Sequence, residues 1–263
     1  MKAFKGEITL NRNSRGCYIL DTVKGCNIVN TRPRGCYDDC YAKNIADRYK
    51  FDFGSPVKRD FPRSDYQPSL FGFKDSEHAS RMVKAIRKIK MPFVRIGEMG
   101  DPSEDWWHTL AVCEEIRPAG KPIVIITKHW HPIPEELLPT LAGICINTSV
   151  SALDAEKDLA YRLGQYNRLK PHCKSVLRIV SCNFNMENEE GERRQRVQEK
   201  LFENAGSIDT VFRPSPSNPF LVAGVIKAEK KKFLGANMLA SVYNPDTYFG
   251  RCETCPDMCG VTT

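Results

Sequence analysis

The sequence predicts an α/β protein: a partial (β/α)6 barrel with parallel strands inside, helices outside and a short Cys-rich extension at the C-terminus. Short apolar runs alternate with helix-like segments, which is typical of a parallel sheet. Counting gives about six β/α units, too few for the closed eight-unit barrel of about 250 residues. The turn-rich end of the chain carries three cysteines, so we expect residues 1–245 to form the barrel and 246–263 the extension.

The elements follow in order from local patterns. Apolar residues recur at helical spacing in Ser76–Lys90, and Pro134 opens a short helix. Apolar runs such as PIVIIT and VLRIV are typical of buried strands. We expect strands at Tyr18–Val23, Phe93–Gly97, Pro122–Thr127, Ile144–Val150, Val176–Val180 and Thr210–Phe212. We expect helices after Cys40 and at Ser76–Lys90, Glu104–Glu115, Pro134–Leu141, Asp154–Leu169 and Glu192–Asn204.

Composition narrows the class of protein. The 263 residues are 41% hydrophobic, enough for a sizeable core, and the 27% charged residues are spread rather than massed, which argues against disorder. No apolar run approaches the ~20 residues that span a bilayer, and the N-terminus lacks an apolar signal core. We therefore expect a cytoplasmic protein with no membrane contact. The net charge of +7 permits a polyanionic partner without requiring one.

The eleven cysteines are the most informative feature. A disulfide scaffold is normally short and secreted, so clustered thiols here indicate metal or redox chemistry. Cys113, Cys145 and Cys173 are isolated, and we expect them to pack in the core. Cys182 follows a strand end, but a structural role is favoured for it as well.

The remaining cysteines form two groups in turn-rich sequence. Cys26, Cys36 and Cys40 form the first, with Cys17 a little upstream. Its wide spacing suits zinc poorly, whereas three thiolates around a [4Fe–4S] cluster leave one iron open to a small molecule. Cys252, Cys255 and Cys259 form the second group. A C-x2-C pair with a third cysteine is compatible with zinc or with a cluster.

The first group resembles a known motif. This group resembles the cluster-binding loop of the radical S-adenosylmethionine (radical SAM) superfamily. The resemblance is carried by Gly25-Cys26, Gly35-Cys36 and Cys40-Tyr41-Ala42. The group is most similar to spore photoproduct lyase-like and related phage-encoded members. The usual spacing is C-x3-C-x2-C with an aromatic before the last cysteine. Here the first gap is longer, Asp39 precedes Cys40, and Cys17 is an alternative to Cys26 as the first ligand.

The resemblance implies both cofactors and a reaction. Cys26, Cys36 and Cys40 would hold a [4Fe–4S] cluster whose open iron is chelated by the amino and carboxyl groups of S-adenosylmethionine. Reductive cleavage of the sulfonium would yield a 5′-deoxyadenosyl radical that abstracts hydrogen from the substrate. The second group resembles an auxiliary cluster, with zinc as the alternative and Cys17 as an additional ligand.

Further cofactor contacts follow from the resemblance. Gly97-Glu98 is similar to the turn that contacts the methionine amino group in the superfamily. The polar residues that follow Ile146 at the strand end are similar to those that contact the ribose or the methionine carboxylate. Arg178 lies in an apolar strand, where it needs an anion, either a ligand carboxylate or a core acid. Residues predicted to bind the cofactor are Tyr41, Gly97, Glu98, Asn147, Ser149, Ser151 and Arg178.

The catalytic residues and the substrate are less constrained. Tyr41, Cys182 and Tyr243 are candidates for hydrogen transfer by residue chemistry alone. Asp101 is a candidate for the mouth of the same site, and Lys128 faces either the substrate or solvent. For the turn His129–His131, a surface position is favoured over a substrate contact. The resemblance and the charge favour a nucleic acid or nucleotide substrate over a peptide, which is the alternative because peptide-modifying relatives also carry auxiliary clusters. The expected electron donor is a flavodoxin or ferredoxin. The alternative is a nucleic-acid-binding protein with zinc or iron–sulfur sites and no radical chemistry.

Overall fold

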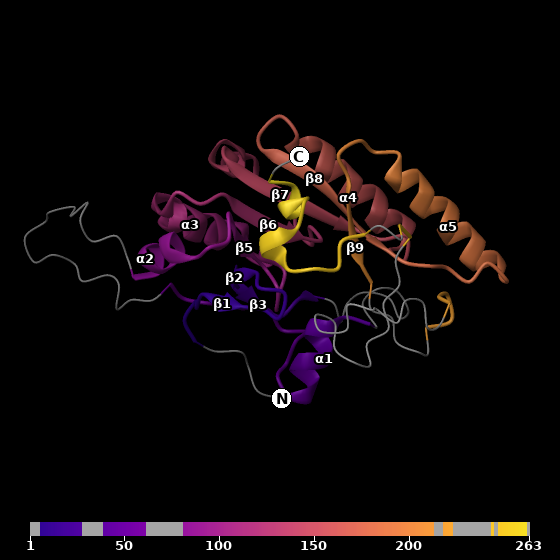
Figure 1. The fold of residues 1–263 in the computed structure, drawn as a ribbon, viewed down its shortest axis with the longest axis horizontal. Coiled ribbons are helices and arrows are strands. Elements are labelled where there is room, and N and C mark those ends of the chain that lie inside the picture. Colours follow the sequence, from indigo (N-terminus) through magenta and orange to yellow (C-terminus); the bar gives the residue numbers. More distant parts are fainter. Residues whose placement is uncertain are drawn as a thin grey trace, which may run out of the picture.

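A mostly parallel seven-stranded sheet, in the order β1-β2-β5-β6-β7-β8-β9, forms the centre of the computed structural model (Figure 1). The structure describes residues 6–27, 39–61, 81–212, 218–222, 243–244 and 247–261. The strands of this sheet are β1 (Asn11–Arg12), β2 (Tyr18–Leu20), β5 (Val94–Ile96), β6 (Ile123–Thr127), β7 (Ile144–Val150), β8 (Lys174–Ser181) and β9 (Ile208–Val211). All neighbours are parallel except β1 and β2. The predicted α/β class is confirmed.

The helices alternate with these strands, as the sequence predicts. They are α1 (Tyr41–Arg48), α2 (Arg81–Lys88), α3 (Trp106–Ile116), α4 (Glu156–Leu169) and α5 (Glu189–Phe202). Short 3-10 helices are η3 (Pro102–Asp105), η4 (Arg117–Ala119), η5 (Glu135–Leu141), η6 (Cys252–Thr254) and η7 (Met258–Gly260). A small second sheet pairs β3 (Val23–Lys24) with β4 (Val57–Lys58). No helix in the described ranges is both long and apolar enough to cross a membrane.

The two faces of the sheet are covered differently. On one face, α4 packs Leu159 and Tyr166 against Leu177 and Ile179 of β8. Burying such side chains contributes about 1.5–3 kcal/mol each, which holds the helix layer on the sheet. In Figure 1, α1 lies beyond the β1–β3 end of the sheet, far from α4 and α5, which lie beside β8.

The other face carries polar side chains in register. Ser149 of β7 lies beside Arg178 of β8. Residues 247–261, yellow in Figure 1, cross this face, and the Asn147 side-chain amide donates to the Cys259 carbonyl at 2.9 Å. A Cβ on Gly260 would lie 2.6 Å from a Val176 methyl, so only glycine permits this close approach. The C-terminal segment is thus packed on the polar face of the sheet.

Most elements begin or end within a few residues of the predicted bounds, and three of the shifts have a clear local cause. β2, the first strand expected from the sequence, ends at Leu20 rather than at Val23, because the Asp21 side chain accepts two backbone N–H groups there. α4 begins at Glu156 because Asp154 is buried in an ion-pair network instead. α5 begins at Glu189, where the Asn188 side chain accepts the Gly191 N–H and acidic residues occupy the first turn.

Candidate functional site

A cavity of about 590 Å³ opens where the β5 and β6 strands end and extends along the polar face of β7 and β8. Parallel strands bring their carboxyl ends to one edge of a sheet, so ligand sites collect there. The predicted residues that line this cavity are Cys26, Cys40, Tyr41, Gly97, Glu98, Ser149 and Arg178. Asp101 and Lys128 line it too. Segments separated widely in sequence are therefore joined in one site.

Two of the three predicted cluster cysteines lie at this cavity. Cys26 follows β3, and its backbone N–H donates to the Phe53 carbonyl at 2.9 Å. Cys40 directly precedes α1 and packs against the small apolar cluster that contains Cys26. Cys36 lies outside the described residues. Thiols of this kind fit an iron–sulfur cluster in their chemistry, because thiolate sulfur is its usual protein ligand.

The Cys26 thiol is buried and hydrogen-bonded. Its side chain is 8% exposed, and the Trp130 indole N–H donates to its sulfur at 2.8 Å. Burial raises the pKa of Cys26 well above its ordinary value, and Asp101 and Glu104 raise it further. A metal that binds this sulfur must therefore displace its proton.

The Gly97-Glu98 turn lines the cavity, and its backbone is fixed by local contacts. Gly97 has φ +92°, and a Cβ there would approach Pro102 to 2.9 Å. Asp21 Oδ1 accepts the backbone N–H groups of Glu98 at 2.7 Å and of Met99 at 3.0 Å. Sequence reasoning missed Asp21, although an acid inside an apolar run was a signal that could have found it.

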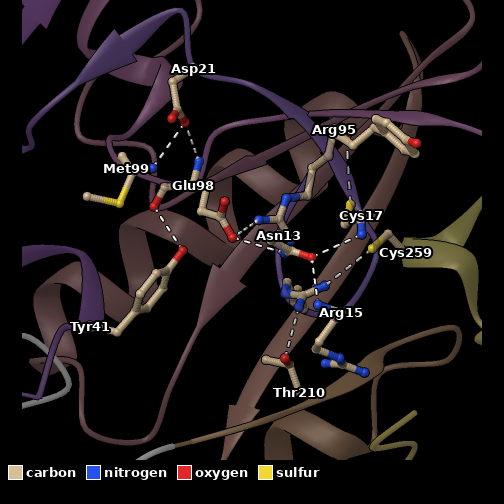
Figure 2. Close-up of polar contacts among 12 residues, drawn as sticks. Asn13, Arg15, Cys17, Asp21, Tyr41, Arg95, Glu98, Met99, Thr210 and Cys259 are labelled. Atoms are coloured by element: carbon tan, nitrogen blue, oxygen red, sulfur yellow. Dashed lines mark hydrogen bonds and ion pairs between the residues drawn. The ribbon is translucent and has the colours of Figure 1, made fainter. Parts of the chain in front are cut away.

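The Glu98 carboxylate is held at a defined position by protein donors. Its Oε1 accepts from the Asn13 amide at 3.0 Å and from the Arg95 guanidinium at 3.1 Å (Figure 2). The Tyr41 hydroxyl donates to the Glu98 backbone carbonyl at 3.0 Å. Burial of this hydroxyl raises the pKa of Tyr41, so it remains a donor at neutral pH. The turn and the start of α1 are thereby tied together.

Arg178 of β8 lines the cavity. Its guanidinium donates to the Thr210 hydroxyl at 2.8 Å and to the Cys259 sulfur at 3.8 Å. Within the described residues no carboxylate forms an ion pair with Arg178. Of the two predicted partners, the core acid is therefore not found in this part of the chain.

Four other predicted residues lie away from the cavity lining. Asn147 lies under the C-terminal segment, and the Ser151 hydroxyl accepts the Leu153 N–H in the turn before α4. Cys182 is buried, and its backbone pairs with the Gln198 side chain. Tyr243 stacks on Phe202 with ring centroids 5.0 Å apart. Each of them has a packing or turn contact in the structure.

The turn after β6 departs from the predicted surface turn at His129, which is buried, whereas the His131 side chain is 55% exposed, as predicted. His129 is 1% exposed, and burial lowers its pKa to about 3. Arg162 lies over the Trp130 ring at 5.2 Å and pairs with Asp154 at 2.8 Å. Lys128 also reaches Asp154, at 3.1 Å. Lys128 and Trp130 line the cavity themselves, and the buried Asp154 and Arg162 contact them.

The C-terminal cysteines approach Cys17. The Cys252 N–H donates to the Arg15 carbonyl at 2.8 Å, which ties η6 to the turn before β2. A hydrogen bond with the Cys17 thiol lowers the pKa of Cys252 to about 6. Across the described stretches, however, no three Cys, His, Asp or Glu side chains are placed to hold a metal ion. The arrangement of this second group does not fit a metal, and its predicted cluster stays a prediction.

The isolated cysteines lie where the sequence predicts. Cys113 and Cys145 are buried in the main core, and Cys173 packs against it. Burial raises the pKa of Cys113 to about 12, which keeps its thiol protonated and unreactive.

Comparisons of the chain with protein-family models, with curated proteins and with solved structures found no match.

Proposed function

We propose that the protein is a radical SAM enzyme whose cavity holds S-adenosylmethionine beside a [4Fe–4S] cluster. One observation carries the proposal: Cys26, Cys40, the Gly97-Glu98 turn, Ser149 and Arg178 all line one cavity. These residues come from five separate stretches, and the sequence singled out each of them for the same site. Their convergence on one cavity supports a shared cofactor site.

Cys26, Cys36 and Cys40 would hold the cluster, with Cys17 as the alternative to Cys26. A reduced cluster held there would supply the one electron needed for reductive cleavage of the S-adenosylmethionine sulfonium to methionine and a 5′-deoxyadenosyl radical, which would take a hydrogen atom from the substrate. The sheet, in this proposal, is a partial (β/α)6 barrel.

The chain itself would bind and orient the cofactor. The Glu98 carboxylate accepts hydrogen bonds from Asn13 and Arg95 and offers a fixed acceptor to the methionine ammonium. The Arg178 guanidinium, which has donors in a planar fork, suits a carboxylate. Ser149, beside Arg178 in register, is a donor for the carboxylate or the ribose.

Partners and location extend the same proposal. A flavodoxin or ferredoxin would deliver the electron, in the cytoplasm, where thiols stay reduced. A nucleic acid or nucleotide is the proposed substrate class, in keeping with the net charge of +7. A second cluster at Cys252, Cys255 and Cys259 is not used in any step.

Product analysis separates this proposal from its alternative. Anaerobically purified protein is reduced with dithionite and incubated with S-adenosylmethionine. We expect 5′-deoxyadenosine and methionine from the wild type, none from Cys40→Ala, and wild-type amounts from the core variant Cys173→Ala. Zinc in place of iron, with no cleavage, would instead support a nucleic-acid-binding protein without radical chemistry.

A further inference from the structure

We propose that Trp130 is a positioning residue that sets the reduction potential of the bound cluster through the Cys26 sulfur, and that Arg162 fixes Trp130 in place. This inference rests on the proposed function, because it requires Cys26 to be a cluster ligand. No other step of the proposed reaction uses Trp130.

The contact itself is direct. The Trp130 indole N–H donates to Cys26 Sγ at 2.8 Å, across 104 positions of sequence. An indole nitrogen is a donor only, so the direction of this hydrogen bond is fixed. Cys26 is 8% exposed, so water competes little for its sulfur. Both residues line the cavity.

Trp130 makes two further contacts, one through its backbone and one through its ring. The Trp130 backbone N–H donates to the Ser103 hydroxyl at 2.8 Å. The Arg162 guanidinium carbon lies 5.2 Å from the ring centroid, within the range of a cation–π contact. Arg162 is 2% exposed, and its own position is fixed by Asp154 at 2.8 Å and by the Lys128 carbonyl at 2.8 Å. Trp130 has little freedom to turn its N–H away from Cys26.

The electrostatic consequence follows from the direction of the bond. A donor to a ligand sulfur stabilises negative charge on that sulfur. A reduced cluster carries one more negative charge than an oxidised one, so the donor favours the reduced form. Loss of the indole N–H is therefore expected to shift the reduction potential to a more negative value.

The test compares Trp130→Phe with Trp107→Phe. Trp107 lies on α3 and is 59% exposed, so it is a matched control outside the cavity. Both proteins are reconstituted anaerobically, their iron is counted, and their clusters are titrated with dithionite under electron paramagnetic resonance (EPR). We expect Trp130→Phe to retain iron and to show a reduction equilibrium about tenfold less favourable, which is ~59 mV for one electron. Trp107→Phe should match the wild type.

The outcomes are distinguishable. A wild type without iron refutes the proposed function and this inference with it. Iron retained in Trp130→Phe at the wild-type potential overturns the role of Trp130 alone. If Trp130→Phe loses iron, the reduction potential of Arg162→Lys is measured instead. This variant keeps a cation beside Asp154 but loses the planar contact with the indole. A wild-type potential in Arg162→Lys then overturns the inference, and a more negative one supports it.

Discussion

The Asp21 carboxylate accepts the Glu98 backbone N–H at 2.7 Å, and this bond joins the end of β2 to the turn that follows β5. The same oxygen accepts the Met99 N–H at 3.0 Å. The Asp21 carboxylate therefore fixes the backbone of the turn that carries the Glu98 side chain (Figure 2). Because Asp21 is buried, its charge state is coupled to the stability of the fold.

Asp21→Ala should destabilise the protein by ~1–3 kcal/mol, because two backbone donors lose their acceptor. Burial raises the pKa of Asp21 above its unfolded value, although the two N–H groups oppose this. A raised carboxyl pKa means that the folded state binds more protons, so its contribution to stability falls as pH rises from the unfolded pKa to the folded one. Urea unfolding across mildly acidic pH should show this fall in the wild type and not in Asp21→Asn. The same slope in both proteins would contradict this role of Asp21.

Asp154→Ala should destabilise the fold by ~3–5 kcal/mol, because it leaves the buried Arg162 without its counter-charge. Burial acts to raise the pKa of Asp154, but Lys128 and Arg162 hold it below the ordinary value. Its contribution to stability is therefore present above the unfolded pKa and is lost as pH falls through the folded pKa.

The control for this prediction is Asp47→Ala, which removes the exposed pair between Lys43 and Asp47. An exposed pair contributes about 0.2–1 kcal/mol, so Asp47→Ala should move the urea midpoint much less. Equal shifts in the two variants would show that Asp154 is not the centre of a buried network.

Gly97→Ala should destabilise the protein, whereas Gly164→Ala should stabilise it. At Gly97, φ is +92° and a Cβ would contact Pro102 at 2.9 Å and the Ile126 carbonyl at 3.1 Å. Gly164 lies within α4 and has open space around its Cβ position, so alanine should add about 0.5–1 kcal/mol there. Thermal unfolding measures both. A rise in Tm for Gly97→Ala would contradict the strained turn.

Arg178→Gln should weaken binding of S-adenosylmethionine by about 10–100-fold, the equivalent of a charged hydrogen bond of ~1.5–3 kcal/mol. Isothermal titration under anaerobic conditions gives the Kd. Arg196 pairs with Glu192 on exposed α5, and Arg196→Gln is the matched control with an expected wild-type Kd. Unchanged affinity in Arg178→Gln would exclude the guanidinium as the carboxylate partner.

The order of strands and helices could be predicted because β-branched runs and helical stripes are local signals. The grouping of Glu98 and Arg178 could be predicted because parallel strands align their carboxyl ends. The Trp130–Cys26 bond could not, since its partners are 104 positions apart and nothing local links them. Nor could the packing of Cys259 on Asn147, because the C-terminal segment has no periodic pattern that indicates which face it covers.

The EPR spectrum of the dithionite-reduced protein, recorded before and after addition of S-adenosylmethionine, tests the central claim most directly. We expect a [4Fe–4S] signal that changes when the cofactor is added and that is lost in Cys36→Ala and Cys40→Ala. A protein that gives no such signal, or a signal that S-adenosylmethionine leaves unaltered, would contradict an open iron at this cavity.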